Sequence, residues 1–532
     1  MLVKEINYKE TSFFSSLFCD YINNKSEIEE LYNLYPSIKN FKKQIEQKKV
    51  NYNDNNREKL YDIIKKQYKG VSCSNEFNSI LELIKKKNTF TITTGHQLNL
   101  FTGPVYFLYK IITTINLCNE LNNTYSKYNF IPVYWMATED HDFQEINHFN
   151  FKNSKIKWDS DQSGVVGEFK TNELKKIIDE IKKVLPNNSN TSELIDLFKE
   201  TYLESNCLSD ATRNFVHLLF KNNNLIIIDA NHKDLKSCFK EFIKNEIKNN
   251  VIKKSSLSTI GKLDKAGYKI QAHSRDVNLF YIEKNKRNRI IKTDNHFIIE
   301  GSNKKLTEKK LIDLVDNNPE KFSPNVLFRT MYQEVLLPNL CYIGGPAEIS
   351  YWLQLKKVFD TAKITFPILL NRNSLLLMSS KQVKKLKKLN LDIDELFLDI
   401  DELLTKKTRE FSELNIDFSE LKSTLTNQFE HLFEIASKTD YSFTGAVKAQ
   451  QKKQLDGIDN LEKRLLSAQK KKFSEQLIKI NELKDELFPN NTLQERFVNF
   501  SEFYCEYGSA IIDILMKNIK PLNNKFSVIE IS

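Results

Sequence analysis

Segments that could cross a membrane or direct export are missing from this 532-residue chain. No apolar run reaches the roughly 20 residues that a membrane-spanning helix needs, so we expect no membrane partner. The first residues, MLVKEINYKETSFFSSLFCDY, carry acidic side chains early and lack an uninterrupted apolar stretch, unlike a secretory signal. We therefore expect a cytoplasmic protein.

Cysteine is sparse and scattered along the chain. The seven cysteines contain no CxxC pair, and their odd number argues against a disulfide framework. The same spacing argues against a thiolate zinc site. We expect buried thiols in a reducing compartment, and we assign no residue as a metal ligand.

A concentrated basic stripe is also missing, although the net charge is +10. The basic residues are mostly lysines, and they are spread beside Asp and Glu rather than gathered with aromatic residues. We therefore expect no nucleic-acid partner. The charge remains compatible with an anionic small molecule.

A strand–helix–strand pattern begins after a mainly helical region, residues 1–88. TFTITT is a short β-rich run that ends at Gly95, and a helical pattern follows in PVYFLYKIITTINLCNEL, with Pro104 suited to its first turn. Residues 131–138, IPVYWMAT, form a second apolar strand. Such a βαβ unit favours a parallel sheet.

Further buried strands are predicted at 225–230, 340–345 and 364–370, as in a sheet that is covered on both faces. Short β-like pieces (VVGEF, LFYIEK, NRIIKT and HFIIE) lie in the polar intervals between them, which we interpret as insertions. The predicted segments are 1–148 (N-terminal helices and first half of the core), 149–210 (first insertion), 211–234 (core strand segment), 235–325 (second insertion), 326–375 (second half of the core), 376–489 (helical coiled coil) and 490–532 (a segment that docks on the core).

The region after residue 376 is strongly helical and almost free of glycine. Apolar residues recur at heptad-like spacing over 458–468, with a weak alanine at the last position, and over 473–487. Pro489 ends this pattern. The apolar face could pack within the chain or form a homodimer, and the sequence leaves both open.

The segment TTGHQ, residues 93–97, joins the first strand to its helix. A helix N-terminus gathers unpaired N–H groups and positive dipole, which suit a phosphate or carboxylate. His96 could stabilise charge there. The candidate binding residues of this loop are Thr94, Gly95, Gln97, Thr102 and Gly103. A tight turn with a capping histidine is the alternative interpretation.

This loop is neither a Walker loop nor a GxGxxG fingerprint. TTGH resembles the HxGH motif of class I aminoacyl-tRNA synthetases, in which the glycine packs on adenine and the histidines stabilise the phosphates. Thr93 stands in the place of the first histidine.

A dense acidic cluster, WMATEDHDFQEINHF (135–149), follows the second strand. Ligands of open α/β sheets bind outside the carboxyl ends of the strands, where this cluster is expected. A carboxylate with a histidine could deprotonate an amine, or carboxylates could hold Mg²⁺ beside a nucleotide. The candidates are Glu139 for binding and Asp140, His141 and Asp142 for catalysis. A transition-metal site and a solvated acidic loop are the alternatives.

A third motif, GGPAE, follows the strand near residue 340. Gly344 and Gly345 suit close approach of a ligand, and Glu348 opens the next helix. Arginine is scarce in this lysine-rich chain, so Arg329 and Arg372 are candidate ligands for a carboxylate or phosphate. His273 and Arg275, in the second insertion, could cover the site.

Three stretches together resemble the BshC family of bacillithiol biosynthesis: TGHQLNLFTGPVYFLYK, PVYWMATEDHDFQEINHF and LLPNLCYIGGPAEISYWLQLKKVF. The likeness runs along essentially the whole chain. It implies an α/β fold, a Rossmann-like parallel-sheet core similar to class I synthetases, with two connecting-peptide insertions and a C-terminal α-helical coiled coil through which the family forms homodimers.

The resemblance also implies an activity: addition of cysteine to the amine of glucosaminyl-malate, which gives bacillithiol. Activation of the cysteine carboxylate would use ATP or another nucleotide, with Mg²⁺ as a candidate companion. Asp140 or His141 would then deprotonate the amine, and Arg329 or Arg372 would hold the malate carboxylates. The alternative is a nucleotide-binding scaffold of the pathway without ligase chemistry.

Overall fold

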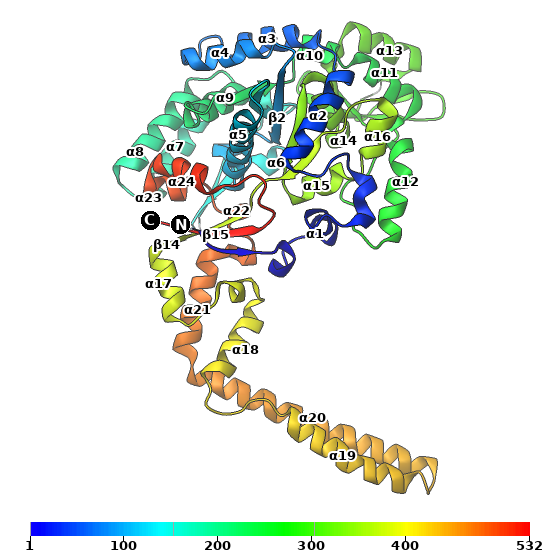
Figure 1. The fold of residues 1–532 in the computed structure, drawn as a ribbon, viewed down its shortest axis with the longest axis vertical. Helices are drawn as coiled ribbons and strands as arrows, with labels where there is room; N and C mark the ends of the chain where they lie inside the picture. The colour runs from blue at the N-terminus through cyan, green and yellow to red at the C-terminus, as the bar shows by residue number, and fades with distance from the viewer. Residues whose placement is uncertain (1, 153, 303) are drawn as a thin grey trace. The chain divides into compact units, whose positions relative to one another are not determined.

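The computed structural model describes residues 2–152, 154–302 and 304–532, and Figure 1 shows its ribbon. The chain forms two compact units. The first is built mainly from Phe13–Leu376 and Gln494–Ile529, and the second mainly from Leu377–Leu493. In the parts of the chain that the structure describes, no helix is long and apolar enough to cross a membrane.

A five-stranded parallel sheet forms the centre of the first unit, in the order β13-β12-β2-β3-β6. The strands are β2 (Thr89–His96), β3 (Asn129–Met136), β6 (Ile226–Asp229), β12 (Asn339–Gly344) and β13 (Ile368–Asn371). Chain order along this sheet reverses between β2 and β12, as in Rossmann-like folds. The predicted parallel α/β core is confirmed, and a crevice is expected at the carboxyl ends of these two strands.

Apolar side chains explain why this sheet is covered. Helix α5 (Tyr106–Thr124) connects β2 to β3, and α2 (Ile38–Asn51) packs near β12. Ile45 of α2, Leu117 of α5 and Ile92 of β2 belong to one buried cluster. Full burial of each such side chain stabilises the fold by about 1.5–3 kcal/mol.

The N-terminal region is helical as predicted, except at its start. Its helices are α1 (Ser16–Ile22), α2, α3 (Asn56–Gln67) and α4 (Asn75–Leu83). The start is a strand that was not predicted: β1 (Leu2–Ile6) pairs antiparallel with β15 (Phe526–Ile531). A partner from the other end of the chain leaves no local pattern in the sequence.

The first predicted insertion is largely helical in the structure. It contains β5 (Ser154–Lys157), α7 (Leu174–Val184) and α8 (Ser189–Phe198). The strand expected at VVGEF is wrong, because Val166–Glu168 forms a 3-10 turn. Backbone N–H groups of Val166 and Gly167 donate to the carbonyls of Asp140 and Thr138, at 2.7 and 3.0 Å, instead of to a strand.

An antiparallel sheet forms in the second predicted insertion, in the order β10-β9-β8-β7-β11. Its strands are β7 (Leu279–Glu283), β8 (Lys286–Lys292), β9 (Phe297–Ile299), β10 (Lys305–Leu306) and β11 (Phe322–Pro324). The three β-like pieces predicted here are confirmed as β7, β8 and β9. Helices α10 (Lys233–Ser237), α11 (Lys240–Asn249), α12 (Val251–Lys265) and α13 (Glu308–Asn317) complete this segment.

The second unit is helical. Helices α19 (Ser419–Ala436) and α20 (Tyr441–Lys472) lie side by side as a long hairpin, and α21 (Ser474–Leu487) ends just before Pro489 (Figure 1). The heptad pattern is interrupted at Phe473, where α20 ends. In α21 the apolar side chains of Leu477, Ile480, Leu483 and Leu487 are buried, whereas Leu461 in α20 is 59% exposed. The hairpin therefore keeps individual apolar side chains exposed.

Candidate functional site

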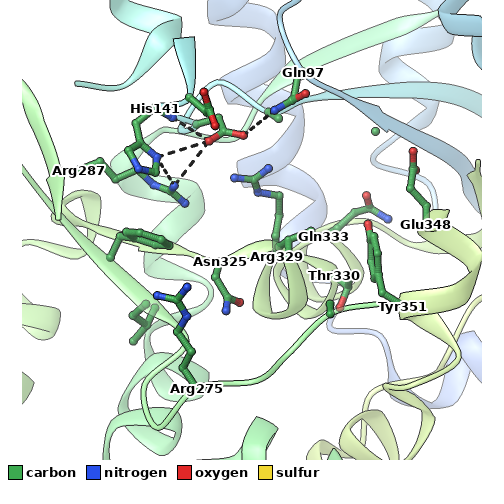
Figure 2. A pocket seen from close by; sticks show the side chains of 18 of the residues that line it. Gln97, His141, Arg275, Arg287, Asn325, Arg329, Thr330, Gln333, Glu348 and Tyr351 are labelled. Carbon is green, nitrogen blue, oxygen red and sulfur yellow. Dashed lines mark hydrogen bonds and ion pairs between the residues drawn. The ribbon is translucent and has the colours of Figure 1, made fainter. Parts of the chain in front are cut away.

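A cavity of about 830 Å³ lies at the carboxyl ends of β2, β3 and β12, where the chain order of the sheet reverses. Strands β7 and β8 of the second insertion and helix α14 (Val326–Leu336) complete its wall. This size falls within the range of small-molecule sites. Figure 2 shows the polar side chains that meet around it.

The end of β2 contributes Gly95 and His96 to the cavity. A Cβ on Gly95 would lie 3.1 Å from the Tyr342 hydroxyl, so the glycine makes room for this tyrosine. His96 packs beside Tyr106 and Phe107, with ring centroids 5.5 and 5.0 Å away. Burial, followed by the charge of Lys110, lowers the pKa of His96 well below its usual value. A neutral ring can hydrogen-bond to a phosphate but adds no positive charge.

The loop after His96 turns away from the cavity. Thr102 and Gly103 have positive φ angles, and neither lines the cavity. The N–H groups of these two residues donate to the carbonyls of Asn99 and Leu100. Val105 N–H donates to the Val498 carbonyl at 2.7 Å. These backbone donors are therefore already used.

Thr94 likewise serves the sheet. Its hydroxyl donates to the carbonyl of Ile343 on the neighbouring β12 at 2.8 Å, and its side chain is buried away from the cavity. Gln97 does line the cavity, and its amide donates to Asp140 at 3.0 Å and to Glu145 at 2.7 Å. The loop thus delivers His96 and Gln97 to the site, rather than a ring of backbone donors.

A partly buried ion pair crosses the crevice between β2 and β12. Lys110 of α5 donates to the carbonyl of Gly95 at 2.7 Å and pairs with Glu348. The Tyr342 hydroxyl donates to the other carboxylate oxygen of Glu348 at 2.7 Å. Burial lowers the pKa of Lys110, although the charge of Glu348 opposes this. Glu348 is therefore held in place on the cavity wall.

The predicted acidic cluster reaches the cavity through Asp140, His141 and Asp142. Burial alone would raise the pKa of Asp140, but the neighbouring His141 side chain and the charge of Arg329 outweigh it and hold this pKa well below its usual range. Asp140 is therefore a poor proton acceptor. Asp142 is exposed and precedes α6 (Phe143–Ile146).

Glu139 points to a different environment. Its carboxylate pairs with Lys236 at 2.7 Å and accepts from Ser323 at 2.8 Å, and it does not line the large cavity. It joins the end of β3 to the second insertion. The structure therefore gives Glu139 a supporting position.

Arginine is concentrated at this cavity. The chain has ten arginines, and four of them line it: Arg275, Arg287, Arg289 and Arg329. Arg329 projects from α14 into the centre of the view in Figure 2 and forms no ion pair with another described residue. A guanidinium without an ion-pair partner suits a carboxylate or a phosphate.

Arg372 and the GGPAE glycines lie elsewhere. Arg372 forms a bidentate pair with Glu495, at 2.8 and 2.7 Å, and both side chains are buried. Arg372 and Gly345 line a neighbouring cavity of about 440 Å³, whereas Gly344 lines neither. A Cβ on Gly344 would lie 3.1 Å from Glu348 Cβ, so this glycine allows tight packing.

Several residues of the cavity had not been singled out from the sequence. Arg287, Lys110 and Tyr342 are the most important of them. A lone lysine within the apolar helix PVYFLYKIITTI is a signal that could have identified Lys110. The scarcity of arginine could likewise have identified Arg287. Tyr342 lies in an apolar strand and carries no comparable signal.

Within residues 2–152, 154–302 and 304–532, no group of three or more His, Cys, Asp and Glu side chains could hold a metal ion.

Two family models match this chain. "Bacillithiol biosynthesis BshC, N-terminal Rossmann-like domain" matches residues 1–373, and "Bacillithiol biosynthesis BshC, C-terminal coiled-coil domain" matches residues 375–531. A Campylobacter jejuni structure described as a "putative arginyl t-RNA synthetase" covers 82% of this chain and 94% of its own, with 11% identity. The TM-score of this match is 0.20.

Relatives from three bacteria are described as "Putative cysteine ligase BshC". Those of Flavobacterium johnsoniae and Flavobacterium psychrophilum are 48% and 50% identical over 526 residues, which cover 99% of both chains. That of Bacillus cereus is 26% identical over 547 residues and covers 100% of both. Since the family models span nearly the whole chain and close relatives align over their full lengths, the chain belongs to the BshC family of bacillithiol biosynthesis.

Proposed function

We propose that this chain is a carbon–nitrogen ligase that joins the carboxyl group of cysteine to the amine of glucosaminyl-malate. The description of its relatives as cysteine ligases supports the reaction class. The observation that carries the proposal is the arginine-lined cavity at the carboxyl ends of β2, β3 and β12, with Asp140 and His141 beside it. A pathway scaffold without chemistry would not need these groups.

Amide formation requires an activated carboxylate. In the proposed reaction a cysteine carboxylate oxygen attacks the α-phosphorus of ATP, which forms cysteinyl-adenylate and releases pyrophosphate. The amine then attacks the acyl carbon; the new C–N bond replaces the C–O bond, and AMP leaves with the electron pair. Mg²⁺ would accompany the nucleotide phosphates.

Arg329 is the proposed ligand of the malate carboxylates, with Arg275 as a second contact. Both line the cavity, and Arg329 has no ion-pair partner among the described residues. A guanidinium binds a carboxylate through two parallel hydrogen bonds, which fixes orientation as well as charge. Arg372 is less suited to this role because Glu495 already occupies its guanidinium.

The proton of the amine needs a different acceptor from the one that the sequence suggested. The Asp140 carboxylate is a weak base because its pKa is held low. We assign Asp142 as the acceptor of this proton, because its exposed carboxylate lines the cavity. Asp142 then passes the proton to water. His96 and Gln97 would hydrogen-bond to the substrate or nucleotide beside Gly95.

Product analysis tests this proposal. Purified protein is incubated with ATP, cysteine and glucosaminyl-malate, and nucleotides and thiol products are separated by chromatography. The proposal predicts AMP and bacillithiol in equal amounts, both dependent on cysteine. ADP would indicate an acyl phosphate instead. Absence of turnover would favour the scaffold.

A matched pair of variants ties the reaction to the cavity. Arg329→Gln should lower kcat/KM for glucosaminyl-malate by about 10²-fold, as expected for loss of a charge-assisted pair. Arg464→Gln makes the same chemical change at an exposed position of α20 and should leave the reaction unchanged.

A further inference from the structure

Arg287 is one of the most firmly held side chains in the cavity wall. Its Nε donates to the Ser323 hydroxyl at 3.0 Å, and its Nη2 donates to the Pro324 carbonyl at 3.0 Å. The guanidinium lies 3.9 Å from the centre of the Phe280 ring. The side chain is only 4% exposed. Strand β8 therefore presents a fixed positive donor to the loop after β3.

The remaining nitrogen of this guanidinium meets His141. Arg287 Nη1 lies 3.0 Å from His141 Nδ1. Arginine has five N–H donors and no acceptor, so a hydrogen bond at this distance requires a lone pair on Nδ1. In a neutral imidazole the proton then resides on Nε2.

Asp140 is the competing partner of this nitrogen. Its carboxylate lies 3.6 Å from His141 Nδ1, which is too long for a hydrogen bond, and 3.8 Å from Arg287 Nη1. The carboxylate instead accepts the His141 backbone N–H at 2.8 Å and the Gln97 amide. The distances thus favour Arg287 as the partner of Nδ1.

We propose that Arg287 is a positioning residue that holds His141 as the Nε2–H tautomer, so that His141 donates a hydrogen bond to substrate. This inference rests on the proposed function, and it assigns a role within the same site. The acceptor would be the acyl oxygen of the activated cysteine, on which negative charge develops when the amine attacks. Donors fixed in advance at such an oxygen stabilise the transition state.

This assignment changes the role of the TEDHD segment, residues 138–142. His141 lines the cavity with a side chain that is 44% exposed, so its Nε2 side is open to a ligand. The imidazole does not take the amine proton, because Nδ1 faces Arg287 and Nε2 already carries hydrogen. Asp140 keeps the loop in place through Gln97 and the His141 backbone.

Histidine tautomers can be measured without any turnover. Protein with ¹⁵N-labelled histidine in a deuterated background is studied at pH 8 by long-range ¹H–¹⁵N correlation, and His141→Gln identifies the signal. We expect the Nε2–H pattern in the unmodified chain and a mixture of tautomers in Arg287→Gln. An Nδ1–H pattern in the unmodified chain would overturn the inference.

Kinetics separate a donor from a base. A glutamine amide can donate a hydrogen bond but cannot accept the amine proton, so His141→Gln should retain much more activity than His141→Ala, which should lose about 10²–10³ in kcat. Both should keep the shape of the pH–rate profile. Equal loss in the two variants, with loss of the acid limb, would contradict the donor role.

Two further variants serve as controls. Ser323→Ala removes the contact to Arg287 Nε but leaves the Nη1 contact, so it should preserve the Nε2–H tautomer of His141. This variant can be measured even if Arg287→Gln fails to fold. His431→Gln, at an exposed position of α19, should change neither readout. If the chain has no ligase activity, the proposed function fails, while the tautomer measurement still decides the role of Arg287.

Discussion

Arg329 and Arg372 are the same residue type and were both predicted from the sequence as anion ligands, but their surroundings differ. Arg329 projects into the cavity without an ion-pair partner among the described residues, whereas Arg372 is buried against Glu495. A buried ion pair that loses one partner leaves an uncompensated charge in the interior. The two arginines should therefore respond to substitution in different measurements.

Arg372→Gln should destabilise the first unit by about 3–5 kcal/mol, since Glu495 would remain buried without its partner. Urea unfolding followed by circular dichroism measures this change. Arg464→Gln, the exposed counterpart, should stay within about 0.5 kcal/mol of the unmodified chain. A stable Arg372→Gln protein with weakened substrate binding would instead identify Arg372 as a ligand.

His96 should make stability depend on pH. Because burial holds its folded pKa well below 6.5, the folded state keeps it neutral while the unfolded state takes up a proton below pH 6.5. Stability is therefore complete above pH 6.5 and is lost as pH falls, by about 1.4 kcal/mol per pH unit.

Unfolding of the unmodified chain and His96→Gln at pH 7.5, 6.0 and 5.0 isolates this effect. The stability advantage of the unmodified chain should shrink between pH 6.0 and 5.0, and His431→Gln should show no such trend because His431 is exposed. A constant difference over this range would mean that His96 titrates normally in the folded protein.

At the scale of elements, the segment between α12 and β7 shows how one buried side chain fixes a wall of the site. Gln354 accepts from the backbone N–H groups of Gln271 and Ala272, at 3.1 Å each, and donates to the Ala272 carbonyl at 2.8 Å. The adjoining His273 and Arg275 line the cavity. These bonds tie the second insertion to the core.

Gln354→Ala should loosen this segment, because two backbone donors and one acceptor lose their partner. We expect faster hydrogen exchange over residues 269–276 and faster tryptic cleavage at Lys269 and Arg275. Exchange in β15, away from the substitution, serves as the internal reference. Unchanged exchange over 269–276 would show that other contacts hold the segment.

The helical hairpin leads to a prediction about assembly. Exposed apolar side chains on α19 and α20 include Leu432, Ile435 and Leu461, at 42%, 46% and 59% exposure. We expect exposed apolar side chains of this hairpin to pair with those of a second copy, as in a coiled coil. Leu432→Lys with Ile435→Lys should convert a dimer to a monomer in sedimentation velocity.

Leu257→Lys is the matched control, since Leu257 is 56% exposed on α12 in the first unit. It should leave the sedimentation coefficient unchanged. A chain that sediments as a monomer before any substitution would contradict the predicted homodimer.

At the scale of the whole molecule, the sequence predicted best those parts of the site that lie next to strands and helices with a clear apolar pattern. The β2–α5–β3 unit has the expected apolar periodicity, and the TEDHD segment follows a strand, so their meeting at one edge of a parallel sheet was predictable. The likeness to BshC along three long motifs was confirmed by the family models.

The remaining parts of the site depend on contacts that one sequence does not encode locally. Arg287 reaches His141 from a strand of the second insertion, and Glu495 reaches Arg372 from the C-terminal segment. The roles of Thr102 and Gly103 were hidden for a similar reason: their N–H groups are used within the loop. Which donors are already occupied is a property of the folded chain.

Above all, we propose that the cavity at the carboxyl ends of β2, β3 and β12 binds the anionic substrate through Arg329. Isothermal titration of glucosaminyl-malate into the unmodified chain, Arg329→Gln and Arg464→Gln measures this directly. We predict that Arg329→Gln weakens binding at least about tenfold, equal to roughly 1.4 kcal/mol, while Arg464→Gln binds normally. Equal affinity in all three proteins would contradict the claim.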